Sequence, residues 1–147
     1  MKIEEYFNHD DLIDFYISRD IEFDEAKKYP HPPLFSYIAK INDSFVGAIT
    51  VCKENDDYIL DEVAVIPEKE NIGIGTALVV AALERIKQDN KNKETNVYLV
   101  AKNPDFFKAR GFNIISREEA PAFSECFTCP DYINKICCPE IMNKKVK

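Results

Sequence analysis

The chain has 147 residues and a formal net charge of −7, and 46% of its residues are hydrophobic and 31% charged. These values predict one soluble globular domain with a core of ordinary size. No apolar run approaches the roughly 18 residues of a membrane span, and the acidic balance argues against a nucleic-acid partner. The N-terminal segment is acidic and lacks the apolar stretch of a secretory signal, so we expect a cytoplasmic protein.

In the N-terminal third, apolar residues first alternate weakly with polar ones and then recur at helical spacing. Residues 1–7 are expected to form a first strand, and the spacing of apolar residues predicts a helix over residues 10–19. A short second helix is expected over residues 23–28. The prolines of residues 29–33 predict a rigid loop after it.

The middle of the chain predicts a meander followed by alternating helices and strands. Strands are expected over residues 36–41, 45–53, 58–66, 96–101 and 112–115, and helices over 74–90 and 104–110. The turn at Asn42-Asp43-Ser44 makes the first two of these strands a hairpin. The order predicts a mixed α/β (α+β) domain, in which helices flank one largely antiparallel central sheet. We expect residues 1–147 to form that single domain.

A glycine turn, Asn71-Ile72-Gly73-Ile74-Gly75-Thr76, separates the third meander strand from the long helix. Such a turn aims free backbone N–H groups at one point, next to the positive end of a helix dipole. This geometry suits an anionic phosphate group. A glycine turn alone often serves only tight packing, so the motif needs support from elsewhere in the chain.

Two further segments supply that support. Val65 and Pro67 form V-x-P before the turn, and the segment Phe106-Phe107-Lys108-Ala109-Arg110-Gly111-Phe112 follows about thirty residues after it. In this order the segments resemble the acetyl-CoA loop and the F-[YF]-x-x-x-G-F segment of the GNAT acetyltransferase superfamily. The resemblance covers residues 36–116.

The resemblance implies a GNAT fold in which the fourth and fifth strands splay apart around acetyl-CoA. It implies contacts to the pantetheine arm from the backbone of Val63, Ala64 and Val65. It implies contacts to the diphosphate from Ile72, Gly73, Ile74, Gly75 and Thr76. The remaining cofactor-binding residues that it implies are Asn103, Phe106 and Phe107.

The chain departs from the family pattern at two positions. Glu70 stands where Gln or Arg is usual, and its carboxylate would repel a diphosphate unless it turned to solvent or Lys69 compensated. Phe107 stands where many members have a tyrosine that protonates the leaving thiolate. A CoA thiol has a pKa near that of cysteine, about 8.5, so it can leave with help from water.

The resemblance implies an N-acetyltransferase that acts on the amine of a small molecule, most plausibly an amino acid. Such transfer needs a base, and Asp61 and Glu62 are the candidate catalytic residues, although strand alternation would place them on opposite faces. Solvent-facing acids are the alternative reading, and His31 is a rival base. The open alternatives in function are a CoA-binding sensor without catalysis and a protein N-acetyltransferase.

The C-terminal tail, residues 117–147, holds four cysteines within thirteen residues: Cys126, Cys129, Cys137 and Cys138. Its C-x2-C-P and C-x-x-E pattern resembles the tail of small N-acetylglutamate-synthase-like amino-acid acetyltransferases. A zinc site, free thiols and a disulfide all stay open. That group carries an acid and then a basic residue where this chain has Ile59 and Asp61, which disfavours glutamate as the acceptor. A homodimer also stays open.

Overall fold

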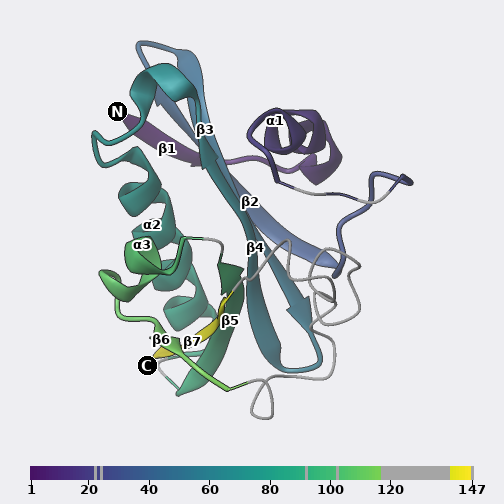
Figure 1. Ribbon diagram of the computed structural model, residues 1–147, viewed down its shortest axis with the longest axis vertical. Coiled ribbons are helices and arrows are strands. Elements are labelled where there is room, and N and C mark those ends of the chain that lie inside the picture. The colour runs from purple at the N-terminus through teal and green to yellow at the C-terminus, as the bar shows by residue number, and fades with distance from the viewer. Residues whose placement is uncertain (22, 24, 92, 102, 117–139, 147) are drawn as a thin grey trace.

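The computed structural model describes residues 1–21, 23, 25–91, 93–101, 103–116 and 140–146. Within these residues, seven strands form one sheet in the order β1-β2-β3-β4-β5-β7-β6 (Figure 1). The strands are β1 (Lys2–Glu5), β2 (Pro33–Ile41), β3 (Ser44–Glu54), β4 (Asp57–Val65), β5 (Thr95–Ala101), β6 (Asn113–Ile114) and β7 (Glu140–Val146). The helices are η1 (His9–Leu12), α1 (Ile13–Ser18), η2 (Pro67–Lys69), α2 (Ile74–Asp89) and α3 (Pro104–Lys108), where η marks a 3-10 helix. The expected mixed sheet flanked by helices is confirmed.

Helices cover both faces of the sheet (Figure 1). The larger core lies under α2, whose apolar side chains recur at helical spacing and are fully buried: Leu78, Val79, Ala82 and Ile86. A smaller core lies under η1 and α1, where Leu12 and Tyr16 pack against Ile38 and Ala48. The sheet therefore presents an α2 face and an α1 face.

The hairpin between β2 and β3 forms as the sequence predicts. Asn42 and Asp43 have φ angles of 51° and 64°, and two successive positive values match the type I′ turn that joins twisted strands. A short turn with Asn55 at φ 57° then leads into β4. The meander β2-β3-β4 is antiparallel throughout.

Strands β4 and β5 diverge, as the resemblance to GNAT enzymes implies. They run parallel and pair at Tyr58↔Val97 and Ile59↔Tyr98. Beyond these pairs β4 continues to Val65 and β5 to Ala101 without further pairing between these two described strands. One edge of β4 is therefore open towards its C-terminal end, in the sense that no described strand pairs with it there.

Two features of the fold differ from the sequence expectations. The second helix is wrong: the described residues 23 and 25–28 contain no helix. Lys27 adopts a left-handed conformation with φ 51°, and the Phe23 ring stacks against Tyr16 at 6.4 Å. Sequence reasoning also missed β7, which pairs antiparallel with all of β5. None of the helices in the described part of the chain is both long and apolar enough to cross a membrane.

Candidate active site

The glycine turn ends in an exposed cradle at the start of α2. Gly73 caps the helix with φ 92°, a left-handed conformation that favours glycine. The first helical hydrogen bond runs from Ala77 N to Gly73 O, so the amides of Ile74, Gly75 and Thr76 lie ahead of the helical bonding pattern. A Cβ built on Gly73 would meet no described atom within 4 Å. The cradle therefore combines open space with amides suited to an anion.

Gly75 lies within the first turn of α2, beside α3. A Cβ at this position would lie 3.4 Å from the Phe106 ring and 3.8 Å from the side chain of Val65. These are ordinary van der Waals distances, so the contact with α3 does not by itself require glycine at this position. The sequence argument, which assigned Gly75 to phosphate approach alone, did not include this contact.

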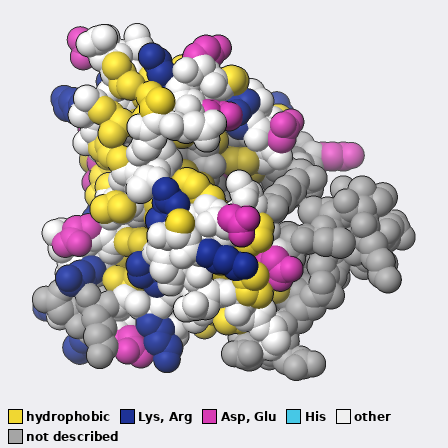
Figure 2. Space-filling model, turned by 60° about the vertical axis from the view of Figure 1, so that its left-hand side comes forward, with side chains coloured by type: hydrophobic (Ala, Val, Ile, Leu, Met, Phe, Trp, Pro, Cys, Tyr) yellow, Lys and Arg dark blue, Asp and Glu magenta, His cyan; other side chains and the backbone are white. Residues whose placement is uncertain are grey.

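A cation lies beside the same helical turn. The Arg110 guanidinium donates a hydrogen bond to the Thr76 hydroxyl and another to Phe106 O at 2.7 Å. It also stacks over the Phe106 ring, 4.1 Å from its centroid. Figure 2 brings this side of the molecule forward, and Lys and Arg side chains lie in the middle and lower parts of the view. Sequence reasoning missed Arg110, although it directly precedes the glycine of the recognised motif.

The carboxylate of Glu70 forms an ion pair with an arginine from the N-terminal part of the chain. Arg19, at the C-terminal end of α1, forms an ion pair with Glu70 and donates from Nε to Val65 O at 2.9 Å. The sequence analysis offered solvent exposure or Lys69 as the remedies for this charge. The Glu70 side chain is 47% exposed, so it does turn to solvent, and Arg19 pairs with it there. Arg19 also joins α1 to the end of β4.

The open edge of β4 presents backbone groups at alternate residues. Ile66 N donates to Val46 O of the β3 side at 2.9 Å, so Ala64 also directs its backbone groups to β3. Val63 and Val65 therefore direct theirs to the opposite edge, where β4 has left β5. Of the three predicted backbone contacts, Val63 and the N–H of Val65 are placed to bind a ligand there, because Val65 O already accepts from Arg19. Ala64 directs its groups to β3 instead.

A β-bulge in β4 brings the two candidate acids to one face. Glu62 pairs with Thr50 and Leu60 with Val51, so Asp61 is an extra residue in the ladder. Leu60 belongs to the core under α2. Ala64 belongs to the core under α1, and Glu62, two residues before it in the strand, shares its face. The expectation that alternation separates the acids is therefore wrong, since the bulge shifts the alternation by one residue.

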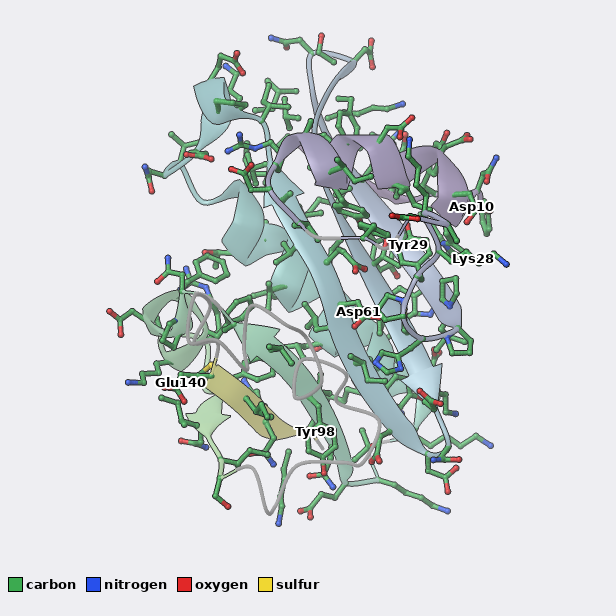
Figure 3. The ribbon with its side chains drawn as sticks, turned by 45° about the vertical axis from the view of Figure 1, so that its right-hand side comes forward. Asp10, Lys28, Tyr29, Asp61, Tyr98 and Glu140 are labelled. Atoms are coloured by element: carbon green, nitrogen blue, oxygen red, sulfur yellow. The ribbon has the colours of Figure 1, made fainter. Side chains whose placement is uncertain are left out.

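Glu62 is a buried acid beside a second acid. It is 3% exposed, and its Oε2 has no hydrogen-bond partner among the described residues. Burial, with a smaller effect of the neighbouring Asp61 charge, raises the pKa of Glu62 far above the ordinary 4.5. Asp61 in turn lies close to the buried Cys52 and, with burial, raises the pKa of that thiol. Figure 3 shows Asp61 on β4, between Tyr29 and Tyr98 in that view.

A family model matches most of the chain. The model, described as the acetyltransferase (GNAT) family, covers residues 2–112. The chain belongs to the GNAT family. The predicted family and fold are thus confirmed, and the match supports an acetyltransferase.

Solved structures agree with this fold. A GNAT-family acetyltransferase from Staphylococcus aureus Mu50 has a TM-score of 0.73 and 21% identity over 99% of both chains. The N-acetylglutamate synthase of Neisseria gonorrhoeae, complexed with coenzyme A and N-acetyl-glutamate, has a TM-score of 0.68 and 17% identity, over 99% of this chain and 35% of that one. An aminoglycoside 6'-N-acetyltransferase complexed with coenzyme A has a TM-score of 0.72 and 14% identity, over 100% and 98% of the two chains. No curated protein matches the chain.

Three further residues named by the sequence analysis are Phe107, Asn103 and His31. Phe107 packs edge-on against Phe112 of the core, with ring centroids 5.9 Å apart, and the exposed Asn103 caps α3. His31 is buried and contacts Glu54 at 2.5 Å, at the end of β3 far along the strand from Glu62. That location does not favour His31 as the base.

The proposed metal ligands are Cys126, Cys129, Cys137 and Cys138, and all four lie outside the described residues. Among the residues that the structure does describe, no group of His, Cys, Asp and Glu is arranged to hold a metal ion. The zinc site stays a prediction.

Proposed function

We propose that this GNAT protein transfers the acetyl group of acetyl-CoA to the amine of a small molecule. The observation that carries the proposal is the alignment of three features along β4: the anion cradle at Gly73, the open backbone edge at Val63 and Val65, and the buried acid Glu62. The first two suit the phosphates and the amide-bearing arm of a coenzyme A thioester. The third suits an acceptor that must lose a proton.

The cradle supports the cofactor assignment on geometry of this chain. The open space at Gly73 would admit a phosphate, and the amides of Ile74, Gly75 and Thr76 would donate to it. Arg110 adds positive charge, while Arg19 cancels the charge of Glu70. The thioester, when bound, supplies an activated acetyl carbonyl. The N–H of Val65 points to the open edge, where it can stabilise negative charge on a carbonyl oxygen.

Glu62 is the proposed general base, and Asp61 is the second candidate. Primary amines are largely protonated at neutral pH, with reference pKa values of about 8–10. A carboxylate with an ordinary pKa is a weak base for such a group. Burial raises the pKa of Glu62 towards that of an amine, so the proton transfer becomes more nearly balanced.

The two acids also bear on the acceptor. Asp61 lies on the same face of β4 as Glu62, and its negative charge would attract a cationic amine and repel an added carboxylate, whereas Glu62 adds charge only when it has lost its proton. An amino acid stays the proposed acceptor class, and N-acetyl-glutamate in the neisserial enzyme supports that class. The acid pair favours an amino acid with a neutral or basic side chain over glutamate.

The test is turnover of acetyl-CoA with a panel of amines that includes neutral, basic and acidic amino acids, an aminoglycoside and a peptide N-terminus. The proposal predicts thiol release that requires an amine, with neutral or basic amino acids ahead of glutamate. Preference for the peptide would indicate a protein acetyltransferase. Tight CoA binding without turnover on any amine would instead indicate a binding module and would contradict the proposed activity.

A further inference from the structure

Three polar side chains form a row across the middle strands of the sheet. Ser36 of β2 lies directly opposite Thr50 of β3, and Thr50 lies directly opposite Glu62 of β4. Side chains at directly opposite positions share a face, with Cβ atoms about 4.5–5.5 Å apart. We call Ser36, Thr50 and Glu62 the polar row.

The polar row lies on the α1 face and is sealed from solvent. Ser36 and Thr50 are fully buried, and Glu62 nearly so. Ser36 Oγ and Thr50 Oγ1 are 2.8 Å apart, and Thr50 Oγ1 is also 2.8 Å from the hydroxyl of Tyr16 on α1. At the far end, Ser36 Oγ is 2.8 Å from Nδ1 of His9.

His9 connects the polar row to the surface. It lies on η1 and is half-buried, in contrast to the members of the row. The Tyr29 hydroxyl donates to His9 O at 2.6 Å and fixes the backbone there. An imidazole has two ring nitrogens, so it can accept a proton on one of them and release a proton from the other.

A single direction of donation gives each hydroxyl in this series of hydrogen bonds an acceptor for its proton. Tyr16 donates to Thr50, Thr50 donates to Ser36, and Ser36 donates to Nδ1 of a His9 that carries its proton on Nε2. Thr50 Oγ1 retains a second lone pair, which can accept from its cross-strand neighbour Glu62. The observed contacts therefore lead from Thr50 through Ser36 to the imidazole. The step from Glu62 to Thr50 requires the Glu62 Oε2, which has no hydrogen-bond partner among the described residues, to turn towards Thr50.

Acetyl transfer to an ammonium substrate creates a need for such a route. The ammonium and acetyl-CoA yield an amide, a thiol and one proton that goes to solvent. If Glu62 removes the first proton from the ammonium, and the proton lost after attack goes to the thiolate, Glu62 still holds the released proton. That proton must leave a carboxyl that is only 3% exposed.

We propose that Thr50, Ser36 and His9 form a proton exit from Glu62 to solvent. Resting on the proposed function, the path runs as a relay: Glu62 gives its proton to the Thr50 oxygen, Thr50 gives its own to Ser36, and Ser36 gives its own to His9 Nδ1. His9 then loses the Nε2 proton to water. The net change is the movement of one proton from Glu62 to water. The hydroxyls then rotate back, and His9 returns to its Nε2–H tautomer by exchanging protons with solvent.

Thr50→Val removes the hydroxyl and keeps the branched shape, whereas Thr50→Ser keeps the hydroxyl and removes a methyl group. We expect Thr50→Val to lower kcat about 10-fold, which is less than the loss of roughly 100-fold or more expected when a general base itself is removed. It should also raise the solvent deuterium isotope effect on kcat, because proton release becomes limiting. Thr50→Ser should restore both values towards wild type, and calorimetry should show unchanged CoA affinity in both variants.

His9→Ala tests the other end of the path and leaves the buried hydroxyls in place. Its kcat should become dependent on buffer concentration and should recover with added imidazole. Thr50→Val should not recover with imidazole, since its path is broken inside the sheet. If Thr50→Val does not fold, the imidazole response of His9→Ala carries the test alone.

Two results would overturn the relay. The first is an active wild-type protein and a His9→Ala variant with the same kcat, the same solvent isotope effect and no dependence of kcat on buffer concentration. The other is equal loss of kcat in Thr50→Val and Thr50→Ser, which would assign Thr50 to packing. A wild-type protein with no turnover would instead contradict the proposed function itself.

Discussion

Single residues set the chemistry of this site, and Gly73 shows how a backbone angle does so. Its φ of 92° and the open space beside it mean that a side chain there would be strained and would project into the cradle. Gly75, by contrast, faces Phe106. The backbone angle therefore favours glycine at position 73, whereas a Cβ at position 75 would make only ordinary contacts with Phe106 and Val65.

We predict that Gly73→Val weakens CoA binding at least 10-fold, which corresponds to about 1.4 kcal/mol. The branched side chain would obstruct the phosphate and strain the turn. Isothermal titration calorimetry with CoA measures the loss. The control is Val80→Ala on α2. Val80 is 55% exposed, and this variant should bind CoA as wild type does. Equal affinity in the two variants would mean that phosphate binds elsewhere.

The buried acid Glu62 has a consequence for stability. Because its folded pKa lies above the unfolded value of 4.5, the folded state binds this proton more tightly. The favourable contribution is complete below about pH 4.5 and is lost as pH rises towards the folded pKa. An uncharged amide at this position removes that dependence.

Glu62→Gln should therefore gain stability relative to wild type as pH rises from 5 to 8. Thermal unfolding of both proteins across this range gives the comparison. The difference in Tm between Glu62→Gln and wild type should widen as pH rises. The control is Glu84→Gln, which changes an exposed acid on α2 and should show no such trend. A constant difference between wild type and Glu62→Gln would contradict the buried, proton-binding state of Glu62.

At the scale of elements, α1 and the glycine turn are joined through one side chain. Arg19 caps the end of α1, bonds to Val65 at the open edge of β4 and pairs with Glu70 at the start of the turn. These contacts explain how a GNAT domain tolerates a carboxylate where the family usually has Gln or Arg. Arg19 also links the helix on the proposed acceptor side to the cofactor side.

Arg19→Gln should leave Glu70 uncompensated and weaken CoA binding by about 3–10-fold, since partly exposed charge pairs contribute about 1 kcal/mol. The double variant Arg19→Gln with Glu70→Gln should recover most of this loss. Measurement at low and high salt should show a larger effect at low salt. A double variant as weak as Arg19→Gln would assign Arg19 a direct contact with the ligand instead.

The regular elements were predictable because local signals determine them. Helical spacing identified α2, and Asn42-Asp43 identified the first hairpin. The glycine turn was found because it lies between a strand and a helix of recognisable pattern. The 3-10 helix η1 was less visible, since residues 10–19 read as one helix while η1 and α1 divide them.

The rest of the site depends on contacts that no local pattern contains. The bulge at Asp61 arises from pairing with β3, so counting alternate residues along β4 assigned the acids to opposite faces. The pair Arg19–Glu70 joins positions 51 apart in sequence. The polar row needs the register of three strands, which the sequence does not specify. Strand β7 follows a stretch rich in proline and cysteine, and its lysines obscure the apolar pattern.

At the scale of the whole molecule, the sheet separates two tasks. The α2 face carries the larger core, and its edge carries the anion cradle. The α1 face carries the acids, the hydroxyls and His9. The gap between β4 and β5 joins the two faces at Val63 and Val65, so a thioester held along β4 would meet an amine arriving from the α1 side.

The most direct test of this account compares wild type and Glu62→Gln in two quantities, the Kd for CoA and the kcat for acetyl transfer to the best amine. The account predicts similar Kd values, because Glu62 lies on the α1 face and not in the cradle. It predicts a kcat lower by about 100-fold or more, as expected for loss of a general base. A Glu62→Gln variant with the wild-type kcat would contradict the account.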